Sequence, residues 1–169
     1  ICDGKDYKIL SSAQDYKRAY DDDKGPNTGG MGAYSPTPFS TQNLLDRVGS
    51  EIILPTLTAM DGRGHPYKGF LYIGLMIVGG KPYVIEFNVR MGDPEAQVVL
   101  PLLQSSLFEL LWNATDGMLH KTDVKISSKT AVTVVMVAEG YPGTYEKGMR
   151  IKGLDNLQNK LIFHASTRR

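Results

Sequence analysis

The most regular pattern in the chain is a pair of short apolar runs on either side of two glycines. Phe70 to Val78 and Pro82 to Phe87 are rich in β-branched and aromatic residues, and Gly79 and Gly80 separate them. A Gly-Gly pair between β-prone runs is a strong signal for a tight hairpin turn. We therefore predict a β-hairpin at this position.

Side chains along the second strand of this hairpin should alternate between its two faces. The face that should pack carries Tyr83, Ile85 and Phe87. The opposite face carries Val84, Glu86 and Asn88. The hairpin is thus expected to bury one side and to present a carboxylate beside a carboxamide on the other.

Apolar residues recur at helical spacing between Ser40 and Met60, with Ser40 or Thr41 as the candidate N-cap. This pattern predicts an amphipathic helix. Pro55 should bend or divide it, because proline removes one backbone donor and clashes with the previous turn.

Two further helices are predicted after the hairpin. The first should begin near Pro94 and end or kink at Pro101. The second should begin at Ser105 or Ser106, since Ser106 and Glu109 have the spacing of a capping box. This part of the chain is therefore expected to combine a hairpin with helices.

The last third of the chain changes character. Ala131 to Ala138 is a near-continuous apolar run rich in valine, which predicts a buried strand. Shorter strands are predicted at Met149 to Lys152 and at Leu161 to Ala165. We therefore predict one unit over residues 1–126 and the start of a second, mainly β unit over residues 127–169.

Composition narrows the classes of function. The 169 residues are 41% hydrophobic, which is enough for a packed core. Lys plus Arg number 19 against 18 Asp plus Glu, so the chain lacks the basic excess of a general nucleic-acid binder. Cys2 is the only cysteine, which excludes an intramolecular disulfide and favours a cytoplasmic setting. The longest uncharged apolar run, Gly69 to Gly80, is too short to span a membrane.

Glu86 and Asn88 are the candidate metal ligands. A carboxylate and a carboxamide two residues apart on a strand can direct two oxygens at one point. Mg²⁺ prefers oxygen ligands and keeps water or substrate phosphates in its remaining positions. The alternative is a half-buried hairpin on which Glu86 pairs with a nearby Lys or Arg.

The residues directly after the hairpin are of types that bind the anionic oxygens of phosphate or carboxylate groups. Arg90 carries a planar guanidinium that can bind phosphate or carboxylate in a bidentate manner. Gly92, Asp93 and Pro94 are typical of a turn and a helix start, with Asp93 as N-cap and Pro94 as first helical residue. The free N–H groups of that helix would lie near Arg90.

Residues 25–32, GPNTGGMG, are half glycine. Glycine permits positive φ and lets backbone N–H groups approach a ligand closely, so a phosphate or carboxylate binding loop is one interpretation. A mobile surface loop fits equally well. The segment is not a P-loop, because the Gly-Lys-Ser/Thr ending is absent.

A predicted short strand over Asp6 to Ser12 leads into Asp15, Tyr16, Lys17 and Arg18. One acid and two bases therefore lie together in sequence. The arrangement fits a binding site, and it also fits a solvated turn with local ion pairs.

Five segments together closely resemble one enzyme family: QDYKR, GPNTGGMGAYSP, GFLYIGLM, VIEFNVRMGDPEAQ and EGYPGTYEKG. The resemblance is to the phosphoribosylamine glycine ligases of the ATP-grasp superfamily and covers essentially the whole chain. It implies an α+β fold: the C-terminal part of an ATP-grasp domain, an antiparallel sheet with helices, followed by the start of a small, mainly β domain. The family's phosphoribosylamine-binding and adenine-binding parts would be contributed by a missing N-terminal portion of the same enzyme. Met91 departs from the family's RFGDPE signature conservatively.

The resemblance also implies roles for individual residues. Glycine, 5-phosphoribosylamine and ATP would be the substrates, and Glu86 and Asn88 would hold Mg²⁺ or Mn²⁺. Arg90 would contact the transferring phosphoryl group, and Asp15 and Lys17 would face the substrates. Asp93 would touch substrate or act only as a cap. The loop that closes over phosphate and amine would consist of Asn27, Thr28, Gly29, Gly30, Met31 and Gly32.

Two other functions remain open at this point. One is an ATP-grasp ligase with a different acceptor, and the other is a non-catalytic interaction module that keeps the fold. Because the resemblance covers only the C-terminal part of the family, these 169 residues alone are expected to bind nucleotide weakly and not to catalyse ligation.

Overall fold

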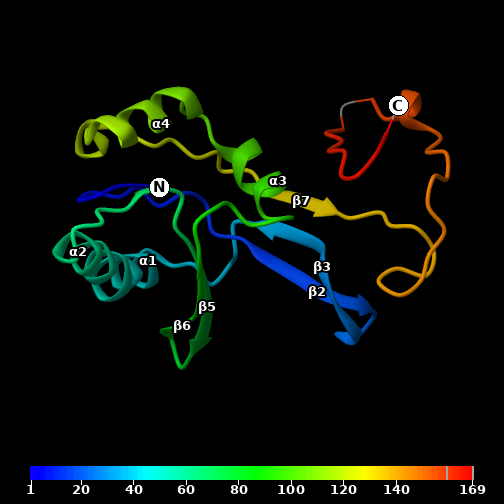
Figure 1. The fold of residues 1–169 in the computed structure, drawn as a ribbon, viewed down its shortest axis with the longest axis horizontal. Coiled ribbons are helices and arrows are strands. Elements are labelled where there is room, and N and C mark those ends of the chain that lie inside the picture. The colour runs from blue at the N-terminus through cyan, green and yellow to red at the C-terminus, as the bar shows by residue number, and fades with distance from the viewer. Residues whose placement is uncertain (159, 169) are drawn as a thin grey trace.

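The computed structural model describes residues 1–158 and 160–168 and combines antiparallel strands with short helices (Figure 1). The α+β prediction is confirmed. The strands are β1 Cys2–Asp3, β2 Gln14–Tyr20, β3 Lys24–Ser35, β4 Lys68–Gly69, β5 Tyr72–Val78, β6 Lys81–Asn88 and β7 Ala131–Val134. The helices are α1 Gln42–Val48, η1 Gly49–Ile53, α2 Leu54–Gly62, α3 Ala96–Val99, η2 Leu100–Leu102, α4 Leu107–Asp116, η3 Leu119–Lys121 and η4 Leu154–Asn156. Within the described ranges, every helix is too short or too polar to cross a bilayer.

The body of the molecule is built from the helices and the N-terminal segment. Figure 1 shows the N-terminus between the α1–α2 region and α4, with the hairpins β2–β3 and β5–β6 extending away as two arms. One apolar cluster centres on Leu57 of α2, and a second centres on Leu110 and Leu119 near α4. A third cluster joins Val98 and Val99 of α3 to β3. Burial is therefore concentrated in the body, and the arms are lightly covered.

The predicted helix over residues 40–60 exists and is divided near Pro55. Thr41 is its N-cap, and its hydroxyl accepts a hydrogen bond from the Leu44 amide at 3.3 Å. The wider turn η1 precedes the proline, and the Leu54 amide there donates to the carbonyl of Gly49. Pro55 lies at the start of α2, where its missing N–H removes the least hydrogen bonding.

The two helices predicted after the hairpin are also confirmed. The first gives way to the tighter turn η2 at Pro101. The second, α4, is capped by Ser106, whose hydroxyl accepts from the Glu109 amide at 3.2 Å. Gly117 ends α4 in the left-handed conformation, as glycine commonly does at this position.

The predicted hairpin is confirmed as β5 and β6, with Gly79 and Gly80 both at positive φ in the turn. A bulge at Ile85 interrupts the pairing, because Leu75 pairs with Val84 whereas Gly74 pairs with Glu86. The bulge reverses the alternation. Residues that pair directly share a face, so Val84 lies on the face of Leu75, and its predicted place beside Glu86 is wrong.

The predicted packing face of the second strand is wrong as well. Tyr83, Ile85 and Phe87 are 54%, 64% and 46% exposed. The residues of the hairpin that pack against the α1–α2 cluster are on the first strand, at Ile73 and Leu75. The body therefore covers β5 more than β6.

A three-stranded sheet forms, and two of its strands lie where a loop and a turn were predicted. β2 contains the charged QDYKR segment and pairs with β3, which contains the glycine-rich segment 25–32. β7 then pairs with β3 on its other edge. Both segments are strands because each supplies the backbone partners that the other requires, which local composition does not show. The predicted strand at Asp6 to Ser12 is reduced to a single bridge between Tyr7 and Cys2.

The C-terminal third contains less strand than predicted. The predicted buried strand 131–138 is limited to β7, and Val132 and Val134 on it are 70% and 76% exposed. Only the side of β7 that carries Ala131 packs, against the Val98 cluster. The segments 149–152 and 161–165 form no strand in the described residues.

Candidate functional site

Glu86 and Asn88 lie on the same face of the β5–β6 hairpin. Asn88 pairs with Tyr72, and Glu86 pairs with Gly74, with no irregularity between the two pairs. Residues two apart on a regular strand share a face, so both side chains extend from one side. A Cβ on Gly74 would lie 3.1 Å from Cγ of Glu86. The glycine therefore leaves space in which the carboxylate side chain lies across the neighbouring strand.

Tyr72 connects this face to the turn that follows β6. Its hydroxyl donates to Oε1 of Glu95 at 2.8 Å, and Glu95 is only 7% exposed. Burial above all, then the hydrogen bond to Glu95, raises the pKa of Tyr72 far above its usual value of 10.0. The negative charges of Glu95, Asp15 and Glu86 act in the same direction. The phenol is thus a neutral donor to a buried carboxylate.

Sequence reasoning missed the pair of Tyr72 and Glu95. Both lie inside motifs that were recognised, GFLYIGLM and RMGDPE, but only the neighbouring residues were given roles. A buried glutamate needs a partner, since an unpaired carboxylate is costly away from water. The sequence contains no signal that Glu95 would be buried, because its environment comes from β5 and α3.

The turn after β6 differs from the prediction. α3 begins at Ala96 with Glu95 at the N-cap position, so Asp93 as N-cap and Pro94 as first helical residue are wrong. Oδ1 of Asp93 instead accepts from the side-chain amide of Gln97 at 2.7 Å. α3 has four residues, which is too short for a substantial helix dipole. Any anion at this end would depend on side chains.

Arg90 lies exposed between the hairpin and this turn. Its Nη1 atom donates to the carbonyl of Met91 at 2.9 Å. This contact uses one of the five N–H donors of the guanidinium. The side chain therefore keeps donors for a ligand and lies two residues from Asn88 in the chain.

The glycine-rich segment forms a wide bulge in β3. Tyr16 pairs with Gly32 and Arg18 pairs with Asn27, so residues 28–31 face Lys17 alone. The amide of Gly30 donates to the Thr28 hydroxyl at 3.0 Å, and the amide of Gly29 donates to the Tyr141 hydroxyl at 3.3 Å. The segment is thus part of a strand rather than a mobile surface loop, and hydroxyl groups of the chain engage two of its amides.

Gly30 brings this bulge against the turn after β6. Its φ is +130°, and a Cβ there would collide with Cδ of Pro94 and lie 3.2 Å from the carbonyl oxygen of Asp93. Two motifs that are far apart in sequence, GPNTGGMG and RMGDPE, are therefore in direct contact. Only glycine allows the backbones to approach this closely.

Replacing Gly30 with alanine should destabilise the protein by about 1–3 kcal/mol, because the added methyl group overpacks a buried contact at a strained φ. Urea unfolding of both proteins would measure this. Gly62→Ala is the matched control, since a Cβ there meets nothing within 4 Å. An equal change in the free energy of unfolding at both positions would contradict the close contact proposed at Gly30.

Asp15 and Lys17 lie on β2 rather than in a turn. Nζ of Lys17 is 3.7 Å from Oδ2 of Asp15, so they form a local ion pair. Oδ2 of Asp15 is otherwise buried without a hydrogen-bond partner in the described structure. The charge of Asp15 is also among the lesser causes that raise the pKa of Tyr72.

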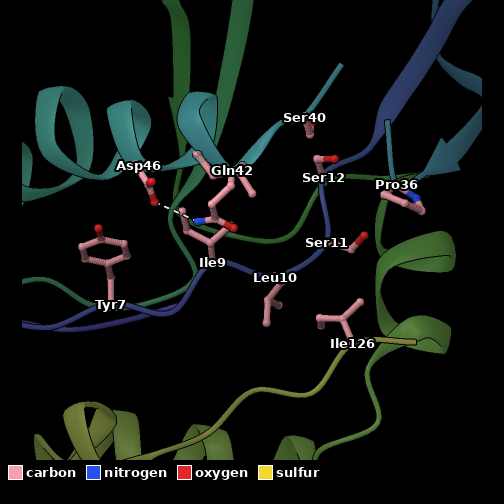
Figure 2. Close-up of a pocket in the computed structure, with 11 residues that line it drawn as sticks. Tyr7, Ile9, Leu10, Ser11, Ser12, Pro36, Ser40, Gln42, Asp46 and Ile126 are labelled. Atoms are coloured by element: carbon pink, nitrogen blue, oxygen red, sulfur yellow. Dashed lines mark hydrogen bonds between the residues drawn. The ribbon is translucent and has the colours of Figure 1, made fainter. Parts of the chain in front are cut away.

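A cavity of about 430 Å³ lies elsewhere, between the segment after β1 and the start of α1 (Figure 2). Several of its polar groups have partners in the chain: the Ser11 hydroxyl accepts from Ser35 at 2.7 Å, and the Gln42 amide donates to Asp46 at 2.8 Å. The predicted site residues are absent from its lining. The cavity is therefore separate from the candidate site.

The donor chemistry of the hairpin face fits a hard divalent cation. Glu86 is exposed and Asn88 is half-buried, and each contributes an oxygen on the same face. The described residues contain no cluster of three or more His, Cys, Asp or Glu side chains suited to a metal. Two protein oxygens match the way in which Mg²⁺ is bound together with substrate phosphates.

The chain matches two family models. Residues 1–96 match the phosphoribosylglycinamide synthetase ATP-grasp (A) domain, and residues 131–169 match the phosphoribosylglycinamide synthetase C domain. The first match alone covers more than half of the chain. The predicted ATP-grasp part of an α+β ligase is thereby confirmed.

Individual relatives agree with these matches. The chain is 47% identical over 172 residues to a phosphoribosylamine–glycine ligase of Chlorobaculum tepidum, covering all of this chain and 40% of the relative. It is 50% identical over 167 residues to a bifunctional purine biosynthetic protein of Schizosaccharomyces pombe, covering 98% of this chain and 21% of that protein. A crystal structure of phosphoribosylamine–glycine ligase from Thermotoga maritima is 39% identical, with a TM-score of 0.75 over 86% of this chain and 36% of that one. The chain thus spans 40% or less of the length of these relatives.

Proposed function

This chain belongs to the phosphoribosylglycinamide synthetase family, and we propose that it is the metal and phosphoryl-transfer part of an ATP-dependent ligase. The ligase joins glycine to 5-phosphoribosylamine and yields glycinamide ribonucleotide, ADP and phosphate. The N-terminal part present in the relatives completes the enzyme, which functions in the cytoplasm. Support comes from relatives named for this activity over the whole length of the chain.

The single observation that carries the proposal is the shared face of Glu86 and Asn88 beside Arg90. Glu86 and Asn88 are the proposed ligands of Mg²⁺ or Mn²⁺. When bound, the metal neutralises charge on the ATP phosphates. Arg90 follows the second ligand after one residue, so its guanidinium can reach oxygens of the same phosphate group.

The protein's own contribution is to position the reactants. The glycine carboxylate attacks the γ-phosphorus, ADP leaves, and an acyl phosphate forms. The amine of 5-phosphoribosylamine then attacks the activated carbonyl and expels phosphate. Arg90 orients and stabilises the phosphoryl oxygens during both steps, which is the main source of rate enhancement in such reactions.

The remaining predicted residues surround these groups. We assign Asp15 and Lys17 to the substrate side, because both lie on β2, whose partner strand β3 carries the glycine-rich bulge. The bulge of β3 contacts the Asp93–Pro94 turn, which supports a role next to the phosphates. The assigned bulge residues are Asn27, Thr28, Gly29, Gly30, Met31 and Gly32, with Asp93 opposite them. The division at residue 127 is also kept as a proposal, supported by the C-domain match from residue 131.

The dependence of ADP formation on the acceptor substrate distinguishes the proposed function from two competing ones. A different ATP-grasp ligase would form ADP with another acceptor, and a non-catalytic module would form none. In the full-length protein that carries this chain, we expect ADP formation that requires both glycine and 5-phosphoribosylamine and is lost on chelation of divalent metal by EDTA. ADP formation independent of glycine would refute the proposal.

The same assay on the 169 residues alone gives a second test. These residues are expected to bind nucleotide weakly and to show no ligation, because the chain spans 40% of the relative's length and the family resemblance implies that the adenine-binding part lies in the rest. Ligation by the purified chain, without a complementing fragment, would contradict this expectation.

A further inference from the structure

We propose that Tyr72 and Glu95 form a positioning pair that holds the segment from Asn88 to Glu95 in the shape required for metal and phosphate binding. This inference rests on the proposed function and extends it to two residues without an assigned role. Neither residue is proposed to touch the substrates. They act through Asn88 and Arg90, which lie within the segment they hold.

Tyr72 fixes the first end of the segment through the backbone. It pairs with Asn88 in the last register position of the β5–β6 ladder. Paired residues on antiparallel strands have neighbouring side chains on one face, so the ring of Tyr72 lies beside the carboxamide of Asn88. The proposed metal ligand therefore has an aromatic ring as its immediate neighbour.

The hydroxyl of the same residue fixes the second end. It donates to Oε1 of Glu95 at 2.8 Å. The carbonyl of Glu95 accepts from the amides of Val98 and Val99 at 3.0 and 2.9 Å, which joins the turn to α3. One side chain thus connects the end of β6 to the start of α3, and Arg90 lies between the two fixed points.

The space around the pair leaves little room for another arrangement. A Cβ on Gly92 would collide with Oε2 of Glu95 and lie 2.8 Å from Cε2 of Tyr72. Gly92 is buried, as is Glu95. The turn therefore packs closely against the Tyr72–Glu95 pair. Loss of the hydrogen bond between them should shift the residues that precede Glu95, including Arg90.

The hydrogen bond also satisfies a buried carboxylate. Glu95 is 7% exposed, and the Tyr72 hydroxyl supplies a side-chain donor to it. Phenylalanine would leave the buried Glu95 carboxylate without this donor, which is a costly arrangement.

Tyr72→Phe in the full-length protein tests the proposal. We expect weaker binding of Mn²⁺ in the presence of ATP, measured by the electron paramagnetic resonance of free Mn²⁺, by about 10–100-fold. The kcat for glycine-dependent ADP formation should fall by a similar factor, with the KM for glycine less affected. Tyr83→Phe is the matched control, since Tyr83 is exposed on the same hairpin, and it should leave both values unchanged.

A double-mutant cycle separates positioning from a general loss of stability. If Tyr72 acts through Arg90, the loss of kcat caused by Tyr72→Phe should largely disappear in an Arg90→Ala background. Full additivity, or unchanged Mn²⁺ binding in a folded Tyr72→Phe protein, would overturn the inference. Absence of glycine-dependent turnover in the unmutated protein would instead refute the proposed function. In that case, a comparison of Mn²⁺ affinity between the unmutated protein and Tyr72→Phe would still test the role of the Tyr72–Glu95 pair. Should Tyr72→Phe fail to fold, Glu95→Gln supplies the same comparisons.

Discussion

Glu86→Gln in the full-length protein should lower kcat/KM for glycine-dependent ADP formation by about 10³-fold. The substitution keeps the size of the side chain and removes the only negative charge among the two proposed metal ligands. A divalent cation held by one carboxylate and one amide depends strongly on that charge, and loss of one preorganised electrostatic contact costs about 10²–10³ in rate. The KM for MgATP should rise together with the fall in kcat.

The control for this prediction is Glu109→Gln on α4. Glu109 is exposed and lies on a helix of the body, away from the hairpin arm. It should retain the activity of the unmutated protein. Unchanged turnover in Glu86→Gln, under conditions where Mg²⁺ is limiting, would remove the basis of the metal assignment.

Arg90→Lys should lower kcat by about 10²-fold, while the free energy of unfolding changes by less than about 0.5 kcal/mol. Lysine keeps the positive charge but loses the planar fork that binds two oxygens of one phosphoryl group. Arg90 is exposed and donates only to the adjacent Met91 carbonyl, so its replacement should not disturb packing. Single-turnover formation of ADP would measure the chemical step directly.

Arg63→Lys is a suitable comparison, because Arg63 is exposed at the end of α2. If Arg90→Lys kept full activity, charge alone would suffice at this position, and the bidentate contact would be excluded. A large loss of stability in Arg90→Lys would indicate a structural role instead.

The structure explains how two motifs that are separate in sequence meet. The turn of RMGDPE is pressed against the bulge of β3 at Gly30, and the same turn is joined to β5 through Tyr72 and Glu95. The candidate site is thus built where the bulge of β3 and strand β5 both contact one short turn. Substitutions at Gly30 should affect stability, whereas those at Glu86 and Arg90 should affect activity.

Local pattern determined a large part of this protein. The Gly79-Gly80 turn, the caps at Thr41 and Ser106 and the break at Pro55 all follow from short-range rules, because the residues concerned lie within a few positions of one another. The shared face of Glu86 and Asn88 also follows from strand periodicity, since both lie beyond the bulge.

Only the tertiary structure decided the rest. β2 and β3 became strands because each completes the other's hydrogen bonds, against a glycine-rich composition that favours a loop. The bulge at Ile85 changed which residues accompany Glu86, and the burial of Glu95 against Tyr72 depends on strands and a helix that are distant in sequence. Hydrophobic periodicity indicates which residues lie on the same face of a helix or strand. Contacts between helices and strands depend instead on pairing between distant parts of the chain. The surroundings of this site arise from those long-range contacts.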